Sequence, residues 1–172
     1  IGNAVYPDHY DRGWHITGST GMLGAAAGCA RLLGLDERRT QMALGIAASQ
    51  PVGLREQFGP MTKPFHPGAA PRAGLTAALL ARRGFTASPR ALEAPRGFVQ
   101  VVSDKRAWNE ITDGLGERFE IATNTYKPFA CGIVIHPAID AAIQLRAQGV
   151  KPEDVVRVDL KVHPLVLELT GK

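Results

Sequence analysis

The sequence predicts a mainly helical domain followed by the start of a smaller α+β domain. The first part contains a stretch rich in glycine and alanine, residues 17–33, and several turn signals that divide it into helices. Residues 119–122 have an extended pattern, and apolar and polar side chains alternate over residues 156–163, as in a half-buried strand. We therefore assign residues 1–123 to a helical domain and residues 124–172 to a second domain.

The first two helices follow a polar, turn-rich segment. Small side chains over residues 17–33 permit close contact between helices, and Gly34 is a natural helix end. Asp36 is an N-cap for a second helix, which runs to about residue 49. Residues 50–67 are expected to form a loop.

A third helix is expected over residues 67–83, ending before Gly84. Ser88 and Pro89 then begin a short helix that closes near residue 97, and Asp104 caps another that reaches about residue 112. Residues 135–148 have a helical pattern. A single strand at residues 156–163 is unstable by itself, so we expect its partners to lie outside this sequence.

Six of the twelve prolines directly follow a lysine or a histidine, and four of these basic residues belong to two similar stretches: Lys63, His66, Lys127 and His136. Proline pushes the residue before it toward extended backbone, so these four are expected in loops, with each histidine at a helix start. The N-terminus of a helix carries exposed N–H groups and partial positive charge. The Lys63–Gly68 stretch therefore predicts a pocket for a carboxylate or phosphate.

Composition narrows the class of protein. The chain has 172 residues, of which 45% are hydrophobic and 21% charged, as in ordinary globular domains. The net charge of +4 is spread along the chain and few aromatic residues accompany it, so no nucleic-acid partner is expected. The sequence contains no run of about 18 apolar residues, so no membrane span is predicted. Cys29 and Cys131 lack the spacing of a disulfide or zinc site, which favours a cytoplasmic protein.

Three segments carry a resemblance to a known family. They are GWHITGSTG at residues 13–21, GLR with FGPMTKPFHPG at residues 53–55 and 58–68, and YKPFACG with HPAID at residues 126–132 and 136–140. In order and spacing they resemble the middle portion of the MmgE/PrpD family, which includes 2-methylcitrate dehydratase, cis-aconitate decarboxylase and iminodisuccinate epimerase.

The resemblance implies a fragment of a two-domain fold: a helical domain and a smaller α+β lid, with the active site in the cleft between them and homodimerisation through the helical domain. It also implies a small carboxylic-acid substrate and no metal, flavin or nucleotide cofactor. Family members are more than twice as long, so an N-terminal helical part and the rest of the lid are expected beyond this sequence.

The family chemistry removes or replaces a proton next to a carboxylate and passes through an enolate-like intermediate. Such chemistry needs an acid or base and fixed cations. By resemblance, His15 is the acid or base, and Lys63 and Lys127 are carboxylate clamps. Each has a plainer alternative: His15 as a structural histidine at a turn, and the lysines as solvated loop residues.

Substrate-binding candidates are His66, Thr62, Arg55 and Tyr126. The last three side chains can hydrogen-bond a polyanionic substrate, although each is more often structural. His66 and His136 can equally support a helix end, and we favour that role for His136. Cys131 lacks an adjacent base and is expected to be a buried thiol. The histidines lack the spacing of a helical zinc site, so no metal site is predicted.

These residues predict a cofactor-independent lyase, a dehydratase or decarboxylase, acting on a small di- or tricarboxylic acid. Two alternatives remain open. An epimerase of the iminodisuccinate type uses the same enolate and returns the proton to the other face. A truncated, non-catalytic remnant would keep the core of the fold without turnover.

Overall fold

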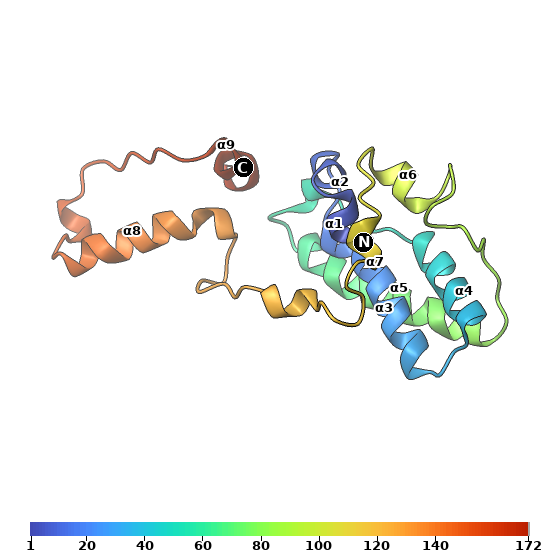
Figure 1. The fold of residues 1–172 in the computed structure, drawn as a ribbon. Coiled ribbons are helices and arrows are strands. Elements are labelled where there is room, and N and C mark those ends of the chain that lie inside the picture. Colours follow the sequence, from blue (N-terminus) through green and yellow to red (C-terminus); the bar gives the residue numbers. More distant parts are fainter. Residues whose placement is uncertain (172) are drawn as a thin grey trace. The chain divides into compact units, whose positions relative to one another are not determined.

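A computed structural model describes residues 1–171 of the chain. The chain is mainly helical and divides into two compact units, each described by itself: unit 1, Ile1–Arg118, and unit 2, which begins at Phe119 (Figure 1). The assignment of residues 1–123 to a helical domain and residues 124–172 to a lid stays a prediction.

Unit 1 is built around three long helices. Two short helices precede them, α1 (Gly2–Val5) and α2 (Asp8–Asp11). The long helices are α3 (Ile16–Leu32), α4 (Glu37–Ala48) and α5 (Thr62–Arg82). The predicted limits of α3 and α4 are confirmed to within about one residue, because both depend on local signals. Gly34 takes a positive φ of 64° after α3, and the Asp36 side chain accepts a hydrogen bond from Arg39 N at 2.8 Å.

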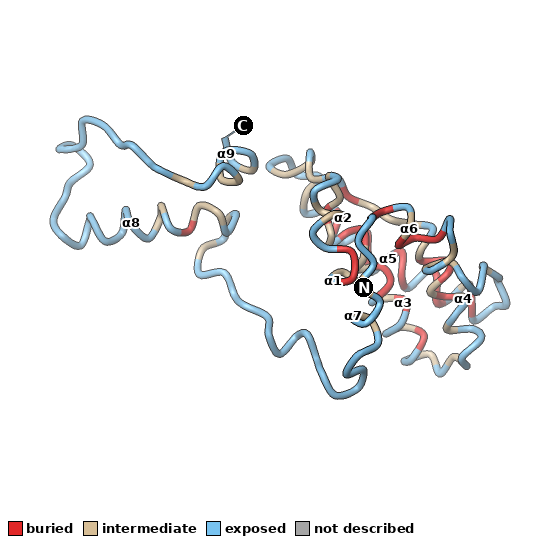
Figure 2. The backbone as a smooth tube through the Cα atoms, turned by 45° about the horizontal axis from the view of Figure 1, so that its top comes forward, coloured by how far each residue is buried: buried red, intermediate tan, exposed pale blue. Residues whose placement is uncertain are grey.

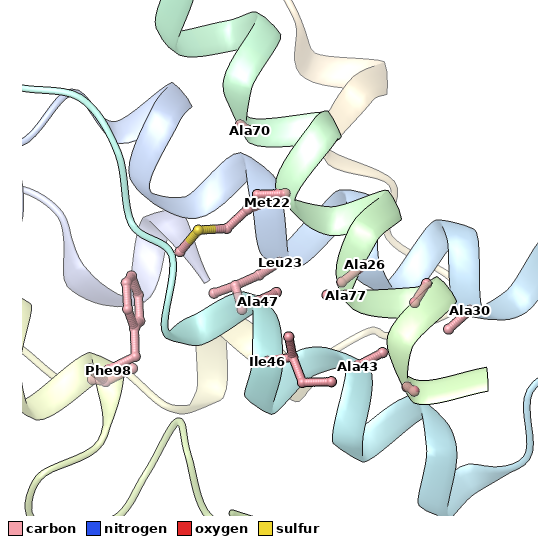
Figure 3. Packing of buried hydrophobic residues seen from close by; sticks show 14 of the residues in the cluster. Met22, Leu23, Ala26, Ala30, Ala43, Ile46, Ala47, Ala70, Ala77 and Phe98 are labelled. Atoms are coloured by element: carbon pink, nitrogen blue, oxygen red, sulfur yellow. The ribbon is translucent and has the colours of Figure 1, made fainter. Parts of the chain in front are cut away.

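Small residues let α3 and α5 approach closely. Gly74 of α5 lies against α3, where an added Cβ would come within 2.5 Å of Ala25 Cβ and 2.6 Å of Met22 O. Figure 3 shows Ala77 of α5 facing Ala26 of α3, with α4 contributing Ile46, Ala43 and Ala47 to the same cluster. The glycine and alanine content of the sequence is thus used for helix packing, as predicted.

The core of unit 1 is mostly alanine, with a few large side chains at one end. Met22, Leu23, Val99 and Val102 are almost fully buried, and Phe98 packs with them. Buried residues follow the inner faces of α3, α4 and α5, whereas most residues of the chain after residue 118 are exposed (Figure 2).

The start of α5 corrects one prediction. The helix begins at Thr62, so Lys63 and His66 lie inside it, and Pro67 and Pro71 are interior residues. Those two prolines remove the N–H donors that would pair with the carbonyls of Lys63 and Pro67. Burial of the alanine face of α5 against α3 and α4 outweighs this loss and the preference of pre-proline residues for extended backbone.

The segment after α5 also differs from prediction. Residues 89–96 form turns instead of a short helix, and α6 (Phe98–Val102) begins after Gly97. The turn folds back, with Phe98 N donating to Ala91 O at 2.8 Å and Val99 N to Leu92 O at 3.1 Å. Asp104 caps no helix: its N–H donates to Asp8 Oδ2, and α7 (Asn109–Thr112) starts after Trp108.

Unit 2 contains one helix of three turns, α8 (His136–Ala147), close to the predicted limits. A shorter helix, α9 (Pro164–Thr170), lies near the C-terminus. The remaining regular elements are single 3₁₀ turns, η2 (Glu120–Thr123), η3 (Ile133–Ile135) and η4 (Pro152–Asp154). Among residues 119–171, His136 is the one buried residue.

The predictions of extended structure at residues 119–122 and of a strand at residues 156–163 are wrong. Residues 120–123 form η2, and residues 155–163 contain no strand. Val156 is 100% exposed and Val158 69% exposed. A strand needs a hydrogen-bonded neighbour, and none of the residues described supplies one to this segment. The described residues of unit 2 therefore do not show a lid domain.

None of the helices in the described part of the chain has the length and apolar composition needed to cross a bilayer.

Candidate functional site

His15 stands at the start of α3, where it is the N-cap residue with extended backbone. Its carbonyl accepts hydrogen bonds from Gly18 N at 2.9 Å and Ser19 N at 3.1 Å, which fix the first turn of the helix. The Ser19 hydroxyl adds a third bond to the same carbonyl at 3.2 Å. These hydrogen bonds fix the backbone of His15 to the first turn of α3.

The loop before α5 holds His15 from the other side. His15 N donates to Gly53 O at 3.0 Å, beside a single antiparallel bridge between Trp14 and Leu54. Gly53 has a φ of 104°, which favours glycine. A Cβ at this position would come 2.9 Å from His66 Nδ1 and 3.2 Å from His15 Cβ. The loop backbone at Gly53 therefore packs directly against both histidines.

The two imidazoles are in contact. His15 Nδ1 lies 2.9 Å from His66 Nδ1, with the rings tilted by 53°. His15 is 7% exposed and His66 3% exposed. α3 and α5 therefore each place a buried histidine at the same point, and these two residues are 51 positions apart in the sequence.

The pKa of His15 is lowered from 6.5 to about 4. Burial is the largest cause, because it penalises the charged ring, and the positive charges of His66 and Lys63 add to it. His15 is consequently neutral at neutral pH, when one ring nitrogen carries a proton and the other has a free lone pair.

Phe58 connects Lys63 to this pair. The His15 ring meets the Phe58 ring edge-on, with centroids 4.9 Å apart, and Lys63 Nζ lies 6.0 Å from the centre of the same ring. Lys63 is partly buried, whereas Thr62 is exposed at the start of α5. The structure thus brings together three of the sequence candidates: His15, Lys63 and His66.

Arg55 is held in another way. Its guanidinium lies 3.9 Å from the centre of the Tyr10 ring and donates to Tyr10 O at 3.0 Å. Arg55 N also donates to Gly13 O at 2.8 Å. These contacts tie the loop before α5 to α2, so Arg55 has a structural part in the site besides the proposed contact with substrate.

Two residues of this network were not singled out from the sequence. His9 and Ser19 are both fully buried, and His9 Nε2 lies 2.6 Å from Ser19 Oγ. His9 stacks on Trp14, and burial lowers its pKa. Through Ser19, this histidine supports the backbone of His15. No motif in the sequence indicates His9. The sequence gives a signal only for Ser19, which falls one helical turn after His15.

The remaining candidates lie in unit 2. Lys127 lies outside the helices, as predicted, and its Nζ donates to Cys131 O at 3.2 Å. Tyr126 is 88% exposed. His136 begins α8, meets the Phe129 ring edge-on at 5.2 Å and is 9% exposed. This packing fits the supporting role favoured for His136.

Residues 1–171 contain no group of three or more His, Cys, Asp or Glu side chains placed to hold a metal ion.

Comparison with known proteins agrees with the resemblance in the sequence. The profile of the MmgE/PrpD N-terminal domain matches residues 1–111. Cis-aconitate decarboxylase of Aspergillus terreus is 34% identical over an alignment of 169 residues that covers 93% of this chain and 34% of that protein. The enzyme of the same name from Homo sapiens is 34% identical over 85 residues, 49% of this chain and 18% of its own length. The enzyme of the same name from Mus musculus is 28% identical over an alignment of 166 residues that covers 91% of this chain and 32% of its own length. The chain spans about a third of the length of the A. terreus and mouse relatives.

Proposed function

The chain belongs to the MmgE/PrpD family, and on this premise we propose that it forms part of the active site of a cofactor-independent lyase. The reaction is the dehydration or decarboxylation of a small di- or tricarboxylic acid through an enolate-like intermediate. Relatives named cis-aconitate decarboxylase make cis-aconitate the first substrate to test. A homodimer and a cytoplasmic location remain predictions.

The observation that carries the proposal is the buried His15, in contact with His66 and within the electrostatic reach of Lys63. A histidine can take or give a proton, and a lysine next to it can stabilise the negative charge that develops on the substrate. Both residues lie in the segment matched by the family profile.

Substrate binding would change the protonation of His15. In the free chain, burial and nearby positive charge lower its pKa to about 4. A substrate carboxylate placed beside Lys63 would offset that positive charge and raise the pKa of His15 again. A general acid or base works best when its pKa is near the operating pH. The anionic substrate would therefore help to prepare His15 for catalysis.

Lys127 is proposed as a second cation for the substrate carboxylates. Lys127 is exposed, and its Nζ donates to a neutral partner, the Cys131 carbonyl. A carboxylate can replace that partner with a stronger, charge-assisted hydrogen bond. Thr62 and Tyr126, both exposed, and Arg55 are proposed as further hydrogen-bond donors to the substrate.

The test uses full-length protein that includes this chain, incubated in deuterated water with cis-aconitate, 2-methylcitrate or iminodisuccinate and followed by NMR. The wild-type protein is expected to release either a decarboxylated product that carries solvent deuterium at the protonated carbon, or a dehydrated product while solvent deuterium enters the recovered substrate. An epimerised product would instead identify the isomerase. Absence of turnover with each of the three acids would favour the non-catalytic remnant.

Variants test the site assignment. His15→Asn keeps a hydrogen-bonding group near His66 but removes the second ring nitrogen, and it is expected to lower kcat by about 100-fold or more. Lys63→Met is expected to reduce kcat/KM by a similar factor. Lys151→Met is the matched control, because Lys151 also precedes a proline but is exposed in unit 2. If His15→Asn and Lys63→Met both behave like this control, the assignment is wrong.

A further inference from the structure

The contact between His15 and His66 has a chemical consequence that neither residue has alone. Both partners in the 2.9 Å contact are Nδ1 atoms. A neutral imidazole carries one hydrogen, on either Nδ1 or Nε2, so a hydrogen bond between two Nδ1 atoms requires opposite tautomers. One ring is protonated at Nδ1 and keeps a lone pair at Nε2; the other is protonated at Nε2.

We propose that His15 and His66 act as one acid–base unit that shares a single proton between their Nδ1 atoms, in which His66 fixes the tautomer of His15 and accepts its charge. This inference rests on the proposed function and gives His66 a role in the reaction as a positioning residue. The sequence had indicated His66 as a contact for substrate.

When His15 is the Nδ1 donor, the reaction involves two proton transfers. The lone pair of His15 Nε2 takes a proton from the substrate, and the electrons of the broken C–H bond stay on the substrate as the enolate. The Nδ1 proton of His15 then crosses to Nδ1 of His66. His15 is left neutral with its proton at Nε2, and the positive charge rests on His66. Delivery of a proton to substrate is the reverse sequence.

The surroundings of the pair disfavour a positive charge on His15. The charged groups that act on His15 are His66 and Lys63, both of α5, and burial further disfavours its cation. The loop before α5 presents the Gly53 backbone and the Phe58 ring, and α3 presents Ser19; none of these is ionisable. A proton taken up by His15 therefore has one described imidazole partner, His66 Nδ1.

Histidine nitrogen NMR tests the shared proton directly. In a sample labelled with ¹⁵N-histidine at pH 7, one of the two residues is expected to be protonated at Nδ1 and the other at Nε2, with a scalar coupling between the two Nδ1 nuclei. His66→Leu should abolish the coupling and return His15 to a free mixture of tautomers. His163→Gln, a change at an exposed histidine in unit 2, should leave it intact. Finding both rings in the same tautomer would overturn the proposal.

Kinetics of the full-length enzyme test the consequence. Leucine at position 66 removes both the hydrogen bond and the charge acceptor, so kcat is expected to fall by about 100-fold with little change in KM. The variant His66→Asn keeps an amide near the position of Nδ1 and should recover part of this loss, together with the fixed tautomer of His15. An active enzyme in which His66→Leu retains the wild-type kcat and pH profile would contradict the proposal.

The NMR and kinetic measurements together distinguish the shared proton from the proposed lyase reaction. Opposite tautomers with an Nδ1 coupling, in a protein that turns over no carboxylic acid, would support the shared proton and reject the lyase. Turnover that depends on His15 but not on His66 would support the lyase and reject the shared unit.

Discussion

Burial and neighbouring charge together determine the protonation of His15, and this makes the stability of the chain depend on pH. The unfolded chain takes up a proton at His15 near pH 6.5, whereas the folded chain does so only near pH 4. The folded state is therefore favoured fully above about pH 6.5, and this contribution is lost as the pH falls through about 4. The lowered pKa corresponds to roughly 3 kcal/mol at most.

Urea unfolding at pH 7 and at pH 4 measures this effect. Wild-type protein is expected to lose more stability between the two pH values than His15→Asn, which has no proton to take up at this position. The loss of unfolding free energy in the wild type should exceed that in the variant by no more than roughly 3 kcal/mol. Equal losses in the two proteins would show that the pKa of His15 is not lowered by folding.

The candidate site could be predicted from the sequence only in part. The motifs indicated His15 and Lys63, and the structure places both near Phe58. The direct contact of His15 with His66 could not be predicted, because it depends on the path of the loop through Gly53. The support from His9 through Ser19 was also missed, since it arises from tertiary packing with no local pattern.

At the scale of helices, the contact between α3 and α5 depends on glycine at one position. In Gly74→Ala, the new methyl group would meet backbone atoms of α3, Ala26 N and Met22 O, at 2.6 Å. Backbone cannot move aside as a flexible side chain does, so the two helices must separate. We expect a loss of about 1–3 kcal/mol in the free energy of unfolding.

The matched control is Gly28→Ala on the exposed side of α3, where no atom lies within 4 Å of the added methyl group. This change is expected to raise stability by up to about 1 kcal/mol, because alanine favours a helix over glycine. Chemical denaturation of both variants provides the comparison. A Gly74→Ala protein as stable as Gly28→Ala would be incompatible with the close packing of α3 and α5.

The helices predicted well are those with signals in their own sequence. Asp36 and Gly34 mark the limits of neighbouring helices, and Pro137 lies in the first turn of α8. The start of α5 was predicted wrongly because packing of its alanine face overrides the local preferences of its prolines. The prediction of a strand at residues 156–163 was wrong for the opposite reason. The alternating pattern is present, but a strand also needs a neighbouring strand to pair with, and its own sequence does not supply one.

At the scale of the whole molecule, the two units should differ in resistance to proteolysis. Residues 112–128 are exposed throughout, and within them Leu115, Phe119 and Ile121 are each more than 60% exposed. Thermolysin, which cuts before large apolar residues, is expected to cleave this segment first. Mass spectrometry should then detect a protected fragment that ends near residue 118.

The helices of unit 1 provide the internal comparison. Leu75 and Leu79 are partly exposed on α5, but they lie within a packed helix and should be cut much more slowly. Early cleavage within α5, or a protected fragment that includes residues 119–171, would contradict the division into two units.

The alanine-rich core of unit 1 also determines what folding costs in side-chain entropy. Among the described residues, eleven of the eighteen buried hydrophobic side chains are alanines. Alanine has no rotamers, so burying it restricts no side-chain torsion, but each methyl group also removes little apolar area from water. Stability therefore depends on how closely the backbones approach more than on the size of the side chains. Alanine scanning would leave most of this core untested, and only substitutions that enlarge side chains would reveal it.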